Sequence, residues 1–188
     1  MEKELVAAAE PDERYMPALA LALVDHPRAT LMELAKAIGV SKATLYRFCR
    51  TRDQLIERLV AHAAALYAQS LEDARLEQGS VQEALQRLIE CHLKHKEIHV
   101  FLMYYWRPEF LDESHPDQTW VKGQCTLDNF FLRAQQEGVY RIDISAAAMT
   151  ELFYSIVIGL IDAERRGRVP RASLAQIIGN AMAKGICV

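Results

Sequence analysis

Hydroxyl and cationic side chains are concentrated in a short stretch of this 188-residue sequence. Hydroxyl, ammonium and guanidinium groups donate hydrogen bonds to phosphate oxygens and to base edges in a DNA groove. The stretch therefore suggests recognition of a nucleic acid, and a phenol lies beside the donors. From residue type and spacing, the candidate contacts are Thr30, Ser41, Lys42, Thr44, Tyr46 and Arg47.

Three histidines form the second group whose spacing could support chemistry. His92, His95 and His99 would share one side of an unbroken helix, so a small helical metal- or ligand-binding protein or enzyme is an alternative function. Three ligands on one helix rarely converge on one ion, however, and a break near residue 96 would separate them. No nucleophile-base-acid arrangement, phosphate loop or paired carboxylate motif is visible. We therefore expect no enzyme activity, no cofactor and no bound metal.

The first element that must position the donors is a short helix. Thr30 and Glu33 form a T-x-x-E capping box, in which each side chain accepts a backbone N–H that the first helical turn leaves unpaired. Apolar residues then recur at helical spacing up to Gly39, a residue that tolerates positive φ. The pattern predicts a helix over 30–38.

A second short helix follows at once. Ser41 can cap a helix over 42–48, in which Leu45 and Phe48 face inward and the polar residues face outward. Two short helices joined by a tight glycine turn are typical of a helix-turn-helix, whose second helix lies in the major groove of DNA. A packed helical hairpin with a solvated face is the alternative interpretation.

The run IGVSKATLYRFCRTRDQL closely resembles the DNA-binding segment of the TetR (tetracycline-repressor) family of bacterial regulators. The shared features are a GVS turn, a small residue, a T-L-Y triplet, the aromatic Phe48 and a T-[KR]-[DE]-x-L pattern. The resemblance implies DNA contacts for Ser41, Thr44, Tyr46 and Arg52, and we add Ala43 to the same surface.

Three positions depart from the family pattern. Arg52 stands where Lys is usual, Arg47 stands where His is frequent, and the Gly that often precedes the capping Thr30 is missing. None of these changes removes a hydrogen-bond donor. We therefore expect DNA binding to be kept and operator preference to differ.

The resemblance also implies an all-α fold of about nine helices. An N-terminal three-helix helix-turn-helix domain would span 1–56, and a C-terminal helical ligand-binding and dimerisation domain would span 57–188. We expect a homodimer that represses transcription and leaves double-stranded operator DNA when a small, largely apolar or aromatic effector shifts the long helix between the domains. Further capping boxes are expected at Thr51–Gln54 and Ser80–Glu83, and Ser173 with Gln176 should start the last helix. With hydrophobic spacing, these signals predict the other helices over 11–24, 51–77, 81–97, 98–107, 117–137, 144–166 and from 173 onward.

Charge and composition agree with this interpretation. The net charge is −3, yet the segment 26–60 holds seven basic and three acidic residues, so it carries +4 and the remainder −7. This polarity suits a DNA-facing end on an acidic body, although four excess charges could also be accidental.

Four cysteines without C-x-x-C spacing predict reduced thiols. With no uncharged 18-residue apolar run and no signal peptide evident, we expect a cytoplasmic protein without a membrane partner.

The predicted helix over 144–166 is apolar almost all round. A surface helix needs only one apolar stripe, so a second buried face implies a second partner, which we expect to be another copy of the chain. A monomer with this helix at its centre is the alternative. The residues that we expect in the dimer interface are Phe153, Ile156, Val157, Leu160, Ile177 and Ile178.

Aromatic, His, Met and Cys side chains concentrate between residues 92 and 154. Helical bundles build small-molecule sites from such residues, although most of them will belong to the core. A buried Glu151 would need a partner and could select a cationic or hydroxylated ligand, whereas a solvent-facing Glu151 would not. The residues that we expect to line the ligand site are His95, His99, Trp106, Trp120, Glu151 and Tyr154.

Overall fold

The computed structural model describes residues 13–112 and 114–187. Within them, nine α-helices and three short 3-10 helices account for the regular structure, and the β pairing found there is an isolated bridge between Tyr140 and Cys187. The prediction of an all-α fold with about nine helices is confirmed.

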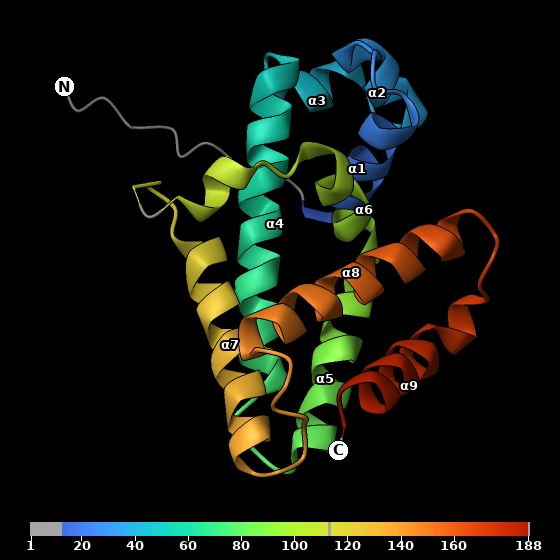
Figure 1. Cartoon of the computed structure of the whole chain (residues 1–188). Coiled ribbons are helices and arrows are strands. Elements are labelled where there is room, and N and C mark those ends of the chain that lie inside the picture. Colours follow the sequence, from blue (N-terminus) through green and yellow to red (C-terminus); the bar gives the residue numbers. More distant parts are fainter. Residues whose placement is uncertain (1–12, 113, 188) are drawn as a thin grey trace.

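Three short helices and the start of a long one form the upper end of the molecule in Figure 1. Helix α1 (Met16–Asp25) follows a 3-10 turn, and the predicted start of this helix near Pro11 lies outside the described residues. Fully buried leucines on α1, α2 and α4 form the centre of this end: Leu23, Leu34, Leu55 and Leu59. The remaining elements here are α2 (Leu31–Ala37), α3 (Lys42–Phe48) and α4 (Arg52–Ala74).

Helix α4 runs the length of the molecule (Figure 1). Its 23 residues span roughly 35 Å at 1.5 Å per residue. It ends at Ala74, three residues before the predicted Glu77, because Arg75 takes a left-handed conformation with φ 46°. The Arg87 guanidinium stabilises this end by donating hydrogen bonds to the carbonyls of Ala74 (2.8 Å) and Arg75 (3.0 Å), groups that a helix end leaves unpaired.

Five further helices complete the molecule: α5, α6 and α7 pack on α4, and α8 and α9 pack on these helices and on each other (Figure 1). Fully buried Phe130, Phe131 and Phe153 lie in their shared core. The break considered near residue 96 is present, because α5 ends at Lys94 and α6 begins at Lys96, with His95 between them. The elements are α5 (Val81–Lys94), α6 (Lys96–Tyr105), a 3-10 turn (Pro108–Leu111), α7 (Thr119–Gln136), α8 (Ala146–Arg165), a second 3-10 turn (Arg171–Ser173) and α9 (Leu174–Ile186).

Helix α6 joins the two ends of the molecule. It packs along α1, and its Ile98, Phe101 and Leu102 belong to the same buried cluster as the leucines of α1 to α4. The predicted boundary between residues 56 and 57 falls inside the continuous helix α4. That division into 1–56 and 57–188 stays a prediction.

Candidate DNA-binding surface and ligand cavity

The predicted capping box starts α2 in the structure. The Thr30 N–H donates to Oε2 of Glu33 (2.7 Å), and the Glu33 N–H donates to Oγ1 of Thr30 (3.3 Å). The hydrogen bond from the Thr30 backbone lowers the pKa of the Glu33 carboxyl. Gly39, with φ +72°, then reverses the chain into α3 at a backbone angle that other residues rarely adopt.

Helix α3 is held at its start by Ser41. The Ser41 Oγ accepts a hydrogen bond from the Thr44 N–H (3.0 Å) and lies 2.8 Å from the Thr44 hydroxyl oxygen. Leu45 is only 2% exposed and anchors the helix to the core. Phe48, predicted to face inward, is half-buried beneath the guanidinium of Arg58 (5.0 Å to the ring centre).

The outward side of α3 is open to solvent. Thr44 is half-buried, Tyr46 is 41% exposed, and the Lys42 ammonium stands 5.1 Å from the centre of the Tyr46 ring. This side can therefore approach another molecule with hydroxyl and cationic groups foremost. The exposed residues of the predicted DNA surface are Thr30, Ser41, Lys42, Ala43, Tyr46 and Arg47.

Arg52 does not share this exposed surface. Its Nη2 donates one hydrogen bond of 2.8 Å to the carbonyl of Pro27 and another of 2.8 Å to the hydroxyl of Tyr105. Its Nε is buried without a hydrogen-bond partner. The guanidinium is thus turned toward the protein, and a DNA contact for Arg52 stays a prediction from the family resemblance.

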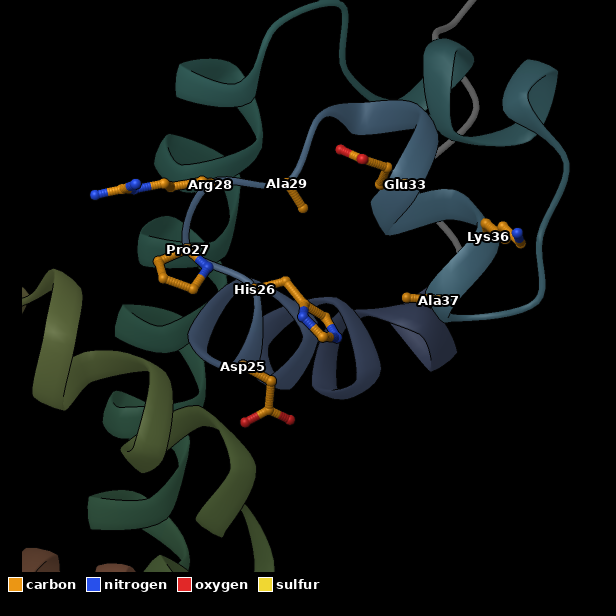
Figure 2. Close-up of a pocket in the computed structure, with 8 residues that line it drawn as sticks. All are labelled: Asp25, His26, Pro27, Arg28, Ala29, Glu33, Lys36 and Ala37. Atoms are coloured by element: carbon orange, nitrogen blue, oxygen red, sulfur yellow. The ribbon is translucent and has the colours of Figure 1, made fainter.

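An open depression of about 710 Å³ lies beside the bend between α1 and α2. In Figure 2, Arg28 and Lys36 extend to opposite sides of it. Glu33, also part of its lining, is already engaged in the α2 cap. Side chains of both charges around an open hollow do not make an enclosed binding site.

A second cavity, of about 350 Å³, lies between α4, α6, α7 and α8. It contains five of the six residues predicted for the ligand site, while His95 lies at the α5–α6 junction beside a much smaller gap. The lining consists of Tyr67, His99, Leu102, Met103, Trp106, Leu111, Trp120, Gln124, Glu151, Tyr154 and Ile158.

Flat rings dominate the cavity wall. Trp120 stacks on Tyr67 with ring centres 5.0 Å apart and planes 19° apart, and Phe110, which does not line the cavity, stacks near Trp120 at 6.4 Å and 18°. The hydroxyls of Tyr67 and Tyr154 are hydrogen-bonded to each other. Burial raises the pKa of Tyr67 to about 12 and raises that of Tyr154 well above its usual value, so both phenols are neutral near pH 7.

Glu151 supplies the one acidic side chain among the residues that line this cavity, and Lys and Arg are absent from that lining. The Glu151 residue is exposed, as in the solvent-facing alternative, yet its Oε1 accepts a hydrogen bond of 3.0 Å from Nε2 of Gln124 at the cavity wall. A carboxylate at the mouth of an aromatic cavity favours a ligand with positive charge.

The histidines do not form a metal centre. His92 is fully buried, its Nδ1 lies 2.9 Å from the Leu88 carbonyl oxygen, and its ring stacks on His99 (5.2 Å, 14°). Burial lowers the pKa of His92 to about 4 and that of His99 to about 3. Across residues 13–112 and 114–187, His, Cys, Asp and Glu side chains nowhere gather in a group of three that could hold a metal ion. The alternative built on His92, His95 and His99 therefore gains no support.

Half of the predicted dimer-interface residues are buried inside the subunit, so that part of the prediction is wrong. Phe153, Val157 and Ile178 have no exposed surface and pack in the lower core. Phe153 and Val157 are four residues apart, which places both on the inner side of α8. The other three predicted residues remain partly accessible: Ile156 and Leu160 are half-buried and Ile177 is exposed, as is Leu152, which was not predicted. Their place in a dimer interface stays a prediction.

Sequence reasoning missed several residues of the cavity wall. Tyr67 continues the line of Leu59 and Ala63 at a spacing of four residues, so the sequence marks it as ordinary core. Gln124 carries no signal of its own. The missed residues are Tyr67, Leu102, Met103, Leu111, Gln124 and Ile158.

Comparison with known proteins agrees with the geometry. No protein-family model matches the chain. The HTH-type transcriptional regulator NfxB of Pseudomonas aeruginosa is 52% identical over 167 residues, covering 89% of this chain and 89% of NfxB. The HTH-type transcriptional repressor LfrR of Mycolicibacterium smegmatis is 27% identical over 171 residues, covering 91% of this chain and 87% of LfrR.

Solved structures give the same result. The crystal structure of the TetR-like regulator LfrR in complex with proflavine matches with a TM-score of 0.72 and 27% identity, covering 97% of this chain and 99% of that chain. PfmR, a TetR-family regulator from Thermus thermophilus, matches in fold with a TM-score of 0.66 and 20% identity, covering 91% of this chain and 97% of that chain. With its helix-turn-helix, its helical C-terminal part and these relatives, the chain belongs to the TetR family of DNA-binding transcriptional regulators.

Proposed function

We propose that the chain is a homodimeric repressor that leaves its operator when a planar aromatic cation fills the cavity between α4, α6, α7 and α8. The observation that carries this proposal is that one chain combines an exposed cationic helix with a partly open aromatic cavity that has one carboxylate at its mouth. The helix supplies the DNA contacts, and the cavity supplies the control. A repressor of this kind acts in the cytoplasm, where the DNA is.

The DNA-binding part of the proposal rests on α3. This short helix carries four donor side chains on two successive turns, so they can reach base edges and phosphates together: Lys42, Thr44, Tyr46 and Arg47. One such helix makes few base contacts, so two copies spaced by one duplex turn are needed for tight binding.

Selection of bound duplexes from random sequence tests this part directly. Lys42→Ala and Tyr46→Ala should each weaken binding to the selected operator by tenfold or more, roughly the effect of losing one good base or phosphate contact, without lowering the melting temperature. Lys122→Ala, an exposed lysine on α7, is the matched control and should bind as the parent does. Unchanged affinity in the α3 variants would contradict the assigned surface.

The ligand-binding part rests on the cavity. Its volume of about 350 Å³ falls within the usual range of small-molecule sites, and the Tyr67 and Trp120 rings in its wall favour a flat aromatic ligand. Glu151 favours a positive charge on that ligand. LfrR, solved in complex with proflavine, supports the same class of ligand, because proflavine is a planar aromatic cation.

Fluorescence titration with proflavine tests this part. Wild-type protein should bind it, and Glu151→Gln should weaken binding by about threefold to tenfold, the range expected for one partly exposed charge pair with a stacked cation. Glu90→Gln, on the exposed side of α5, is the control. Acridine at pH 8, which has the same ring system without the charge, should be insensitive to Glu151→Gln. A wild-type protein that binds neither ring system would overturn the proposed effector class.

The dimer part rests on α8 and α9, which pack side by side (Figure 1). By length and composition, helix α8 could cross a membrane. Only 28% of its most apolar 18-residue segment is buried in the subunit, so much of its apolar surface is left uncovered. In this fold the helix already packs against α7 and α9. Burial of its remaining apolar side against the same side of a second copy accounts for that composition without a membrane.

A further inference from the structure

Arg52 connects three segments of the molecule. It is the first residue of α4, and its Nη2 donates to the Pro27 carbonyl (2.8 Å) and to the Tyr105 hydroxyl (2.8 Å). Its guanidinium also stands 5.9 Å from the centre of the Tyr105 ring. Pro27 lies in the bend between α1 and α2 (Figure 2), whereas Tyr105 is the last residue of α6. Arg52 therefore holds the end of α6 against the helix-turn-helix.

The same turn of α6 forms part of the cavity wall. Met103 and Trp106 line the cavity, one on each side of Tyr105 in sequence. The Tyr105 ring is stacked on the fully buried Phe101 (4.7 Å, 17°), so it has little freedom to move independently of the helix. A bound molecule that shifts the backbone of this turn will therefore also shift the Tyr105 hydroxyl.

The arrangement of Arg52 is not the one expected from a stabilising ion pair. Its Nε is buried without a partner, and its two acceptors are a backbone carbonyl and a phenol hydroxyl. A buried donor without a partner opposes folding. A guanidinium held in this way can lose Tyr105 without leaving a buried carboxylate unpaired, which suits a contact that must break and re-form.

We infer that Arg52 and Tyr105 are positioning residues that transmit occupancy of the ligand cavity to the DNA-binding helices. This inference rests on the proposed function and adds its route of control. With the cavity empty, Tyr105 and Pro27 together fix the Arg52 guanidinium, and so fix α1 and α2 relative to α4. A ligand that moves Trp106 also moves Tyr105 away from Arg52. The Arg52 guanidinium is then less well fixed, and its hydrogen bond to the Pro27 carbonyl weakens. Because the ligand favours one of two arrangements, it shifts the population between them.

The family resemblance gives Arg52 a different role, in which it contacts the DNA backbone. The two roles differ in salt dependence. Loss of one phosphate contact lowers the slope of log K against log salt by about 0.9, whereas loss of a contact within the protein leaves the slope unchanged. We expect Arg52→Ala to keep the wild-type slope.

The main experiment measures operator affinity by fluorescence anisotropy with and without proflavine. In the wild type, proflavine should weaken operator binding by roughly 10- to 100-fold, a typical range for coupled sites. Tyr105→Phe should reduce that factor by about tenfold, since it removes one hydrogen bond to a charged group, by lowering the ligand-free operator affinity toward the value that the wild type has with proflavine, while proflavine affinity stays within about twofold. Arg52→Lys, which keeps the charge but cannot span both acceptors, should do the same.

Tyr104→Phe is the matched control. Tyr104 lies on the same turn, but its hydroxyl lies 3.4 Å from Nη2 of Arg165 on α8 and not against α4. This variant should keep the full coupling factor. The double variant Arg52→Lys with Tyr105→Phe should lose no more coupling than either single variant, because both remove the same contact.

A comparison without ligand separates this inference from the choice of effector. Trp106→Ala alters the cavity wall directly and should change operator affinity severalfold in the wild-type background but by less than about twofold in the Tyr105→Phe background. A wild-type protein that binds operator and ignores proflavine would contradict the proposed effector, and this comparison would still decide the route. Equal effects of Trp106→Ala in both backgrounds, full coupling in Tyr105→Phe, or a lower salt slope in Arg52→Ala would each overturn the inference.

Discussion

The ring of Tyr67 on α4 lies directly against the backbone of Gly123 on α7, so that a Cβ at position 123 would come within 2.2 Å of a ring carbon. The missing side chain leaves room for Tyr67 to stack on Trp120 and to reach the hydroxyl of Tyr154. Gly123 therefore has a specific structural role: it allows the aromatic wall of the cavity to assemble.

Gly123→Ala should destabilise the protein, although glycine to alanine inside a helix normally stabilises it by about 0.5–1 kcal/mol. The added methyl must displace Tyr67, and overpacking of this kind costs about 1–3 kcal/mol. Urea unfolding should show the loss, and proflavine titration should show weaker binding. Gly185→Ala, which meets nothing within 4 Å, should be neutral or slightly stabilising. Equal stability of the two variants would contradict the assigned role.

Leu45 and Tyr46 are neighbours on α3 with opposite environments, so their substitution should separate folding from DNA binding. Leu45 is 2% exposed, and Leu45→Ala should lower the free energy of unfolding by about 2–4 kcal/mol. Tyr46 is exposed, and Tyr46→Ala should change it by less than about 0.5 kcal/mol while weakening operator binding. Chemical denaturation and anisotropy on the same samples check both. A stability loss in Tyr46→Ala as large as that in Leu45→Ala would show that the outward side is part of the core.

Local signals in the sequence predicted the helix starts well. The boxes at Thr30–Glu33 and Ser80–Glu83 are both present, because a capping box depends only on residues three apart. At Thr51 only half of the predicted box forms: its side chain accepts the Gln54 N–H (3.1 Å), while the Gln54 side chain accepts the Arg50 N–H (2.9 Å). The last helix starts at Leu174 with Ser173 as its N-cap residue, as predicted, although a 3-10 turn precedes it and the Ser173 side chain forms no cap hydrogen bond.

Features that depend on distant segments could not be predicted in the same way. The apolar residues of α8 cover more than one side, so the sequence alone could not assign Phe153 to the core and Leu152 to the surface. Only packing against α7 and α9 decides between them. The partner of Arg52 likewise lies 53 residues away, at Tyr105, and no local pattern indicates it.

Stability should fall with decreasing pH below about 6.5, and His92 should account for part of the loss. Burial lowers the pKa of His92 to about 4 in the folded protein, so the unfolded chain takes up a proton first as the pH falls. The contribution of neutral His92 to the free energy of unfolding is complete above pH 6.5 and is lost as the pH falls from there to about 4. At full effect the loss is about 1.4 kcal/mol per pH unit for this residue.

Urea unfolding of His92→Asn between pH 7 and 4.5 checks this effect. Asn keeps a donor for the Leu88 carbonyl but does not titrate, so the variant should be less stable at pH 7 and lose stability with a shallower slope. Parallel slopes for the variant and the wild type would show that His92 takes up its proton equally in both states.

The outward side of α8 and α9 should control the oligomeric state. Leu152 is 41% exposed and Ile177 is 36% exposed, and both lie on helices that pack against each other. Leu152→Glu should weaken dimerisation by at least about 100-fold, because a twofold interface would have to bury two unpaired carboxylates. Sedimentation equilibrium should then show a folded monomer with far weaker operator binding. Leu132→Glu, a 46% exposed leucine on α7, is the matched control and should remain a dimer. If Leu152→Glu stayed dimeric while Leu132→Glu became monomeric, the interface would lie on α7. The distance between the two α3 helices of the dimer would then be set by α7 and not by α8 and α9.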